Sequence, residues 1–305
     1  MKIAIVGAGG IGGYLAVKLI VAGAEVALVA RGSHRAAIAQ RGLRLVEPDG
    51  EVTVKPPVLT DDLGEIGLQD LVIVAVKAHQ LSGAITQLHP ALGPETRVLP
   101  FQNGVDAPDL LARSFGRDRA LIGVARIFAN ITAPGVITRY GVPRRFSIGA
   151  LDGSQSSVGD ILACFRAAGI EAPDLDDIRT DLWTKFILFN ATSSITAGTR
   201  CRFGVLRDLP EVVDLARTIM KETHAVGVAS GVPLPETLIE ECLRLFLEEL
   251  PSDGRTSTAH DLEDGRALEI DYVSGAVARR GRELGVDVTA SETVYALLRP
   301  WRDGR

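Results

Sequence analysis

The stretch "KIAIVGAGGIGGYLA", residues 2–16, decides the fold. A short apolar run precedes three glycines in the pattern G-x-G-x-x-G, at Gly7, Gly9 and Gly12. Between a strand and a helix, such glycines allow a tight turn, close approach of the backbone to a pyrophosphate, and close packing of helix on sheet. The helix N-terminus then offers amide donors to the anion. The predicted dinucleotide loop comprises Gly7, Ala8, Gly9, Gly10, Ile11 and Gly12.

A glycine-rich turn without a ligand is the alternative reading of this loop. It is disfavoured, because glycine at a helix start costs stability unless something needs the space.

Alternation of strands and helices continues from this loop. Apolar runs at 25–30, 70–76 and 96–101 are separated by amphipathic segments such as 11–22 and 80–89. Nearly continuous apolar runs are typical of parallel strands that are buried on both faces. From 119 to 149, shorter runs with a Pro-Gly turn predict an antiparallel extension of the same sheet.

After residue 175 the pattern becomes helical. Long periodic segments are predicted at 182–197, 208–230, 235–250 and 265–284. The sequence therefore predicts an α/β protein, with a Rossmann-type dinucleotide-binding domain over 1–175 and an all-helical domain over 176–305.

Composition excludes several classes of protein. The 305 residues are 46% hydrophobic and 23% charged, with a net charge of -5 and no basic block, so a nucleic-acid partner is not expected. The three cysteines are scattered and lack the spacing of a disulfide framework or a metal site. Glycines, Lys18 and Glu25 interrupt the first apolar stretch, so neither a membrane span nor a signal peptide is predicted and the protein is expected to be cytoplasmic. The oligomeric state, including a homodimer, is left open.

Arg31 indicates which dinucleotide the loop binds. NAD sites carry an acidic residue at the end of the second strand, but no Asp or Glu occurs between Val26 and Val46. Arg31 follows the strand instead, and a guanidinium fits a 2′-phosphate. NADPH is therefore favoured over NADH. The alternative is that Arg31 is a solvated residue before a helix that Ser33 caps.

Polar residues recur in four further segments. Lys77 lies in "VAVKAHQL" (74–81), Asn103 in "FQNGV" (101–105) and Lys185 in "TKFILFNATSSITAG" (184–198). Ser257 and Glu269 lie in "STAHDLEDGRALEIDYVSGAV" (257–277). From the first strand to this last segment, the chain resembles the ketopantoate reductases, that is, the 2-dehydropantoate 2-reductases.

The resemblance implies an NADPH-dependent enzyme that reduces ketopantoate to (R)-pantoate in pantothenate biosynthesis, with its substrate between the two domains. By resemblance, Lys185 is the catalytic lysine and Glu269 the acidic residue that helps to orient it. Ser257 matches the residue that binds the substrate carboxylate. Lys77 and Asn103 match polar residues that line the cofactor–substrate cleft. The resemblance implies that Lys77 and Glu269 contact the cofactor and that Asn103 contacts both the cofactor and the substrate.

The chemistry explains why a lysine is needed. Hydride delivery to a keto carbon leaves an oxygen that must gain a proton, and a cation within hydrogen-bond reach stabilises the alkoxide and donates that proton. At the N-terminal end of an apolar helix, desolvation is expected to lower the pKa of Lys185, and Glu269 to oppose this. The alternatives are a surface lysine at a helix end, a solvated helix charge at Glu269 and a helix N-cap at Ser257.

One departure from the family concerns the substrate. The family commonly shows asparagines four and eight residues after the lysine, where this chain has Phe189 and Ser193. Asn190 lies beside the first position but is rotated by about 100° around the helix. Asn190 and Ser193 are the candidate substrate contacts here, and the phenyl ring predicts a 2-keto acid less polar than ketopantoate. Two alternatives stay open: a D-2-hydroxy-acid dehydrogenase on this scaffold, and a non-catalytic NADP(H)-binding protein.

Overall fold

The computed structural model describes residues 1–153 and 157–305, which form two compact units. The first unit comprises Met1–Gln102 and Ala107–Ile178, and the second comprises Asn103–Asp106 and Arg179–Arg305. The chain therefore enters the second unit twice. The sequence had placed residues 103–106 in the N-terminal domain, whereas in the structure this short segment belongs to the second unit.

A five-stranded parallel sheet forms the centre of the first unit, in the order β5-β2-β1-β6-β7. Its strands are β1 (Lys2–Val6), β2 (Glu25–Val29), β5 (Val58–Thr60), β6 (Gln69–Val74) and β7 (Leu92–Pro100). Every residue of β1 after Lys2 is buried, as expected for a strand with both faces covered. The predicted parallel Rossmann-type sheet is confirmed.

The helical elements of the first unit lie between its strands in the chain, except α5, which follows the last strand. They are α1 (Gly10–Val21), α2 (Gly32–Arg41), α3 (Leu81–Gln87), α4 (Ala107–Phe115) and α5 (Gly159–Ala167), with short 3-10 turns at Leu63–Glu65, Ala78–Gln80 and His89–Ala91.

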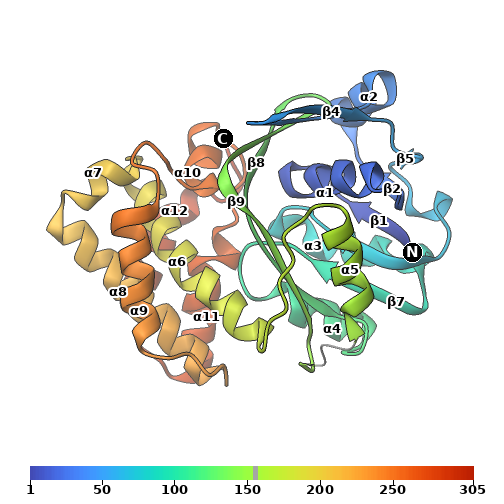
Figure 1. Cartoon of the computed structure of the whole chain (residues 1–305). Coiled ribbons are helices and arrows are strands. Elements are labelled where there is room, and N and C mark those ends of the chain that lie inside the picture. The colour runs from blue at the N-terminus through green and yellow to red at the C-terminus, as the bar shows by residue number, and fades with distance from the viewer. Residues whose placement is uncertain (154–156) are drawn as a thin grey trace. The chain divides into compact units, whose positions relative to one another are not determined.

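A second sheet corrects one prediction. The strands β8 (Leu121–Ala133) and β9 (Val136–Ala150) pair antiparallel as expected. They do not extend the parallel sheet, because they join β3 (Leu43–Glu47) and β4 (Gly50–Val54) in a separate sheet of order β4-β3-β9-β8. Helix α1 lies between the two sheets (Figure 1). A Cβ on Gly10 would lie 1.9 Å from the Ala129 carbonyl oxygen, so glycine is what permits this contact.

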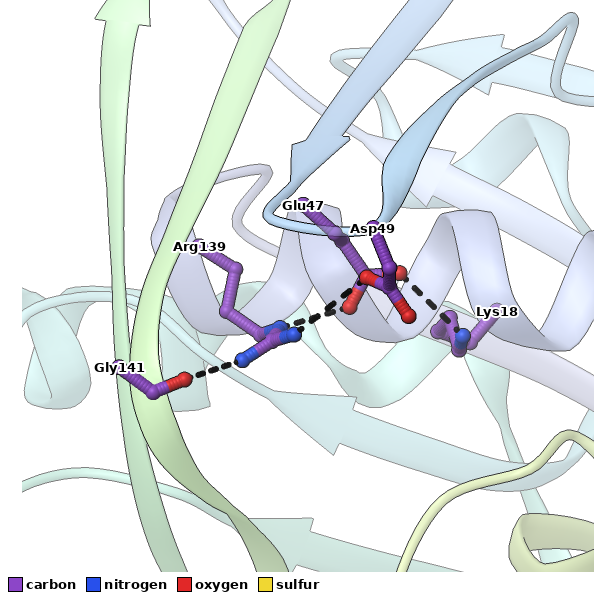
Figure 2. A network of polar contacts seen from close by, with 5 residues as sticks. All are labelled: Lys18, Glu47, Asp49, Arg139 and Gly141. Atoms are coloured by element: carbon purple, nitrogen blue, oxygen red, sulfur yellow. Dashed lines mark hydrogen bonds and ion pairs between the residues drawn. The ribbon is translucent and has the colours of Figure 1, made fainter.

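A buried ionic network holds the second sheet to α1 (Figure 2). Arg139 of β9, whose side chain is 6% exposed, donates from Nε to Glu47 Oε1 at 2.6 Å and from Nη1 to the Gly141 carbonyl oxygen at 2.6 Å. Lys18 of α1 lies 3.4 Å from the other oxygen of Glu47. The carboxylate therefore joins the end of β3 to both β9 and α1.

The second unit is helical, as predicted. Its elements are α6 (Ile178–Thr199), which begins at the last residue of the first unit, α7 (Phe203–Arg207), α8 (Pro210–Ala229), α9 (Thr237–Arg244) with a π-helical continuation (Leu245–Glu249), α10 (Ser257–Glu263), a 3-10 turn (Ile270–Tyr272), α11 (Ser274–Leu284), α12 (Thr289–Leu298) and a 3-10 turn (Arg299–Trp301). Helix α8 packs against α7, α9, α11 and α12 (Figure 1).

Two predicted helix starts were wrong. Helix α6 begins at Ile178, so Lys185 lies about two turns inside the helix and not at its end. The segment predicted as one helix over 265–284 contains a left-handed glycine, Gly265 at φ +66°, and a separate 3-10 turn before α11 begins at Ser274. Over the two described ranges, no helix combines the length and the apolar character that a bilayer span requires.

Candidate functional site

Asn103 joins the two residues that the sequence singled out for proton chemistry. Lys185 Nζ donates a hydrogen bond to Asn103 Oδ1 at 3.0 Å. The amide nitrogen of the same side chain donates to Glu269 Oε2 at 3.4 Å. Asn103, Lys185 and Glu269 come from three separate stretches of the chain, and all three belong to the second unit. An amide suits this position because its oxygen accepts from a cation while its nitrogen donates to a carboxylate.

The lysine projects from the middle of α6, beside an aromatic ring. Lys185 Nζ lies 5.8 Å from the centroid of the Phe189 ring, four residues further along the same helix face. Both side chains are half-buried. The ring attracts the ammonium through its quadrupole but offers it no oxygen acceptor. The position at which the family commonly has an amide is therefore an apolar contact of the lysine here.

Glu269 lies at the start of a 3-10 turn and is 4% exposed. A carboxylate this deeply buried requires donors, and Asn103 supplies one. The adjacent Gly104 fixes the approach of the amide. It has φ +94°, and a Cβ there would lie 2.3 Å from the carbonyl oxygen of Tyr272. The segment that carries Asn103 thus packs directly on the turn that follows Glu269.

The glycine loop of the first unit fits a dinucleotide phosphate. Gly7 has φ +105°, and a Cβ would lie 2.9 Å from the backbone of Ala75. A Cβ on Gly12 would lie 1.9 Å from the carbonyl oxygen of Gly7. Gly9, the N-cap of α1, is different, because its Cβ direction is open for 4 Å. Two glycines are therefore required by packing, and the third leaves space in front of the helix N-terminus for an anion.

Arg31 and Lys77 also belong to the first unit. Arg31 is the N-cap of α2, is exposed, and donates from Nη2 to Gln87 Oε1 at 2.6 Å. Helix α2 begins at Gly32, and the structure shows no side-chain cap at its start, so the Ser33 cap of the alternative reading is not seen in the described chain. Lys77 follows β6 directly after Ala75 and Val76, whose backbone touches Gly7. Both cations thus lie after the carboxyl ends of strands, where ligands of open α/β sheets bind.

Asn190 lies elsewhere than expected. Its side chain is 0% exposed, and Nδ2 donates to Thr223 Oγ1 of α8 at 2.8 Å. Because Asn190 is rotated by about 100° from Phe189 around α6, its side chain faces α8. Its Oδ1 atom has no hydrogen-bond partner within the described residues, so a contact between Asn190 and the substrate stays a prediction.

Ser193 and Ser257 are the two serines that the sequence singled out as substrate contacts. Ser193 is 1% exposed, and its hydroxyl has no hydrogen-bond partner within the residues that the structure describes. Ser257 is the first residue of the short helix α10, after the N-cap Thr256, and is half-buried. Thr256 beside it shares a 2.7 Å hydrogen bond with Thr196 of α6, which ties the start of α10 to the helix that carries Lys185.

Sequence reasoning missed two residues that hold this arrangement. Gln102, buried in the first unit, donates from Nε2 to the carbonyl oxygens of Val74 at 2.9 Å and Val76 at 3.0 Å. Asp106 is 8% exposed and accepts hydrogen bonds from Arg279 and Arg280 of α11. The only signal in the sequence is their position, because Gln102 directly precedes the Asn-Gly pair and Asp106 follows it after one residue.

Comparison with known proteins covers nearly the whole chain. A model of the ketopantoate reductase PanE/ApbA family matches residues 3–153, and a model of the C-terminal part of that family matches residues 177–302. The 2-dehydropantoate 2-reductase of Mesorhizobium japonicum is 36% identical over 98% of this chain and 97% of its own length.

Solved structures agree with this result. The PanE/ApbA family ketopantoate reductase from Ralstonia eutropha JMP134 superposes with a TM-score of 0.90 at 33% identity, covering 99% of this chain and 98% of its own. A D-mandelate dehydrogenase with NADH and anilino(oxo)acetate has a TM-score of 0.88 at 24% identity, covering 99% of this chain and 98% of its own. At that identity the second likeness concerns the fold alone.

Proposed function

Since this chain belongs to the ketopantoate reductase PanE/ApbA family, we propose that it reduces ketopantoate to (R)-pantoate with NADPH, and that Lys185 is the general acid. The observation that carries this proposal is the bond of 3.0 Å from Lys185 Nζ to Asn103 Oδ1, with Glu269 behind the same amide. The name 2-dehydropantoate 2-reductase, borne by a relative that aligns with 98% of this chain, supports it.

The residues that would hold NADPH are the glycine loop 7–12, Arg31 and Lys77. The space in front of Gly9 would take the pyrophosphate, and Arg31 the 2′-phosphate. When bound, the nicotinamide supplies the hydride that the reaction needs. Of the residues predicted from the resemblance to contact the cofactor, Asn103 and Glu269 belong to the second unit.

Lys185 would stabilise and protonate the keto oxygen. An ammonium carries three N–H donors, and the bond to Asn103 directs one of them, which fixes the orientation of the group. A charged donor aimed at a developing alkoxide is typically worth about 3–4 kcal/mol. Glu269 acts through the amide and keeps negative charge near the cation. Ser257 would bind the substrate carboxylate, and Ser193 would use its unpaired hydroxyl on the substrate side chain.

Phe189 favours a second candidate function. With a ring 5.8 Å from the ammonium, the wall beside the reacting group is apolar. The polar hydroxyl of ketopantoate would lose its partner there, at a cost of roughly 1–3 kcal/mol. A D-2-hydroxy-acid dehydrogenase that acts on a 2-keto acid with an apolar side chain fits this wall better.

Steady-state NADPH oxidation with ketopantoate and with 2-ketoisovalerate tests both functions, since the two substrates differ by the hydroxymethyl group. A larger kcat/KM for ketopantoate supports the reductase, and a larger value for 2-ketoisovalerate supports the second candidate. Lys185→Ala is expected to reduce turnover by about 10²- to 10⁴-fold while leaving NADPH affinity unchanged.

Lys221→Ala, on an exposed position of α8, is the matched control and should retain wild-type turnover. Wild-type protein that binds NADPH but oxidises it with neither substrate would refute both enzymes and leave the non-catalytic NADP(H)-binding protein.

A further inference from the structure

We propose that Asp106 is a positioning residue for the reductase reaction, because it clamps the segment that carries Asn103 onto helix α11. This inference rests on the proposed function. It concerns a residue that contacts neither Lys185 nor Glu269 through any hydrogen bond found in the described chain.

The clamp is a carboxylate held by two neighbouring arginines. Arg280 donates from Nε at 3.0 Å and from Nη2 at 2.8 Å to Asp106 Oδ1. Arg279 donates from Nη2 to Oδ2 of the same carboxylate. The Asp106 side chain is 11% exposed and that of Arg280 is 20% exposed, so the pair is shielded from solvent. Charge-assisted bonds of this kind are about twice as strong as neutral ones.

The segment 103–106 is short, and this is why the clamp reaches Asn103. Gly104 is fixed against the Tyr272 carbonyl, and Asp106 is fixed two residues later on α11. Four residues of the segment belong to the second unit, whereas Gln102 and Ala107 on either side belong to the first. The segment has no helix or strand of its own to hold its backbone. Side-chain anchors must therefore determine where Asn103 points.

The position of Asn103 matters to the chemistry because its amide directs the Lys185 ammonium. A shift of about 1 Å in a reacting group costs on the order of 10²-fold in rate. Loosening the segment should therefore lower kcat far more than it weakens NADPH binding, because most of the predicted cofactor contacts, in loop 7–12, Arg31 and Lys77, lie in the first unit.

A double-mutant cycle tests the proposal in the full-length protein. Asp106→Asn preserves the shape of the side chain and removes its charge. We expect it to lower kcat by about 10- to 100-fold and to change the Kd for NADPH far less. In the Asn103→Ala background, Asp106→Asn should cause no further loss beyond about threefold, because coupled residues are not additive. The proposal would be overturned if Asp106→Asn lowered kcat by the same factor in the wild-type and Asn103→Ala backgrounds. Wild-type kcat in a folded Asp106→Asn protein would overturn it as well.

Arg282→Gln is the matched control, since Arg282 lies on the same helix and pairs with Glu292 at 2.9 Å instead. It should retain wild-type kcat. Arg279→Gln is a milder variant, because Arg279 is 46% exposed and Arg280 still holds the carboxylate. Should Asp106→Asn not fold, a graded loss of kcat in Arg279→Gln supports the clamp, and wild-type kcat in Arg279→Gln counts against it.

A readout that does not depend on turnover separates this inference from the proposed function. The side-chain amide of Asn103, assigned in ¹H–¹⁵N spectra with Asn103→Ala, should shift or broaden in Asp106→Asn and stay in place in Arg282→Gln. An unchanged amide signal in Asp106→Asn refutes the clamp. A wild-type protein that reduces no 2-keto acid refutes the proposed function, and the amide signal then still decides whether Asp106 holds Asn103.

Discussion

Replacing Phe189 with asparagine is expected to shift substrate preference toward ketopantoate. Phe189 lies one helical turn after Lys185, with its ring 5.8 Å from the ammonium. The substitution places an amide where the family commonly has one, next to the group that we propose as the proton donor. The amide can then hydrogen-bond the substrate hydroxyl, which 2-ketoisovalerate lacks.

The substitution changes two interactions, and only one of them affects the ratio of kcat/KM between the two substrates. Loss of the ring removes a cation–π interaction of about 0.5–1 kcal/mol with Lys185. This term acts on the lysine and lowers kcat/KM for both substrates alike, so it cancels in their ratio. A hydrogen bond to the substrate hydroxyl in place of an unpaired buried hydroxyl is worth roughly 1–3 kcal/mol. The ratio of kcat/KM for ketopantoate to that for 2-ketoisovalerate should therefore rise by about 5- to 150-fold.

The assay is initial-rate NADPH oxidation with each substrate for wild type, Phe189→Asn and Phe189→Leu. The leucine variant removes the ring without adding an amide, so its ratio should stay within about threefold of wild type. Thermal unfolding of each variant checks that the half-buried position tolerates the change. A ratio that rises equally in the leucine and asparagine variants would show that space, and not hydrogen bonding, sets the preference, and would refute this reasoning.

Three further predictions concern the first unit. Arg139→Leu should lower the free energy of unfolding in urea by about 3 kcal/mol, because it breaks a buried ion pair in which Glu47 keeps one other cation. The hydrogen bonds from Arg97, at 2.6 Å each, hold the pKa of Asp160 below its usual 3.8. This pair should therefore stabilise the fold above pH ~4 and lose its effect as the pH falls through the lowered pKa, so the difference in unfolding free energy between wild type and Asp160→Asn should shrink below pH ~4. Arg31→Ala should weaken NADPH binding by about 10- to 100-fold in fluorescence titrations and leave NADH binding unchanged.

Each of these has a matched comparison. Arg44→Leu breaks an exposed pair with Glu51, and its cost should stay below about 1 kcal/mol; an equal cost for Arg139→Leu contradicts the first prediction. Arg97→Gln should reproduce the acid behaviour of Asp160→Asn, and a gap that persists to pH ~2 contradicts the second. Arg41→Ala, at the far end of α2, should not change NADPH binding. If Arg31→Ala weakens the binding of NADPH and of NADH equally, the third prediction is contradicted.

Local pattern predicted the parallel sheet well. The runs at 2–6, 25–30, 70–76 and 96–101 overlap β1, β2, β6 and β7, because buried parallel strands have a nearly continuous apolar composition. The separate second sheet was not predicted. Strand β3 pairs with β9, about ninety residues later in the chain, and such pairing depends on tertiary contacts that no local pattern records.

The site was predicted as a set of residue types and not as an arrangement. The resemblance to the ketopantoate reductases selected Lys185, Asn103 and Glu269, and the structure joins them by hydrogen bonds through the amide of Asn103. The assignment of residues 103–106 to the second unit could not be predicted, because this segment lies between β7 and α4 of the first unit in sequence. The sequence predicted that the side chain of Asn190 is rotated away from that of Phe189. It did not predict that Asn190 hydrogen-bonds to Thr223.

The Gln-Asn pair at 102–103 explains why the chain leaves the first unit for so short a segment. Gln102 donates to the carbonyl oxygens of Val74, the last residue of β6, and of Val76 just beyond it, whereas Asn103 is bound to Lys185. Consecutive Cα atoms are only about 3.8 Å apart. The peptide bond between these two residues thus links the strand end beside the predicted cofactor loop to the proposed proton donor. An extra residue at this point would also change the distance along the chain between Gln102 and the amide that holds the Lys185 ammonium. On this argument, inserting a single glycine between Gln102 and Asn103 should reduce kcat far more than it reduces the affinity for NADPH.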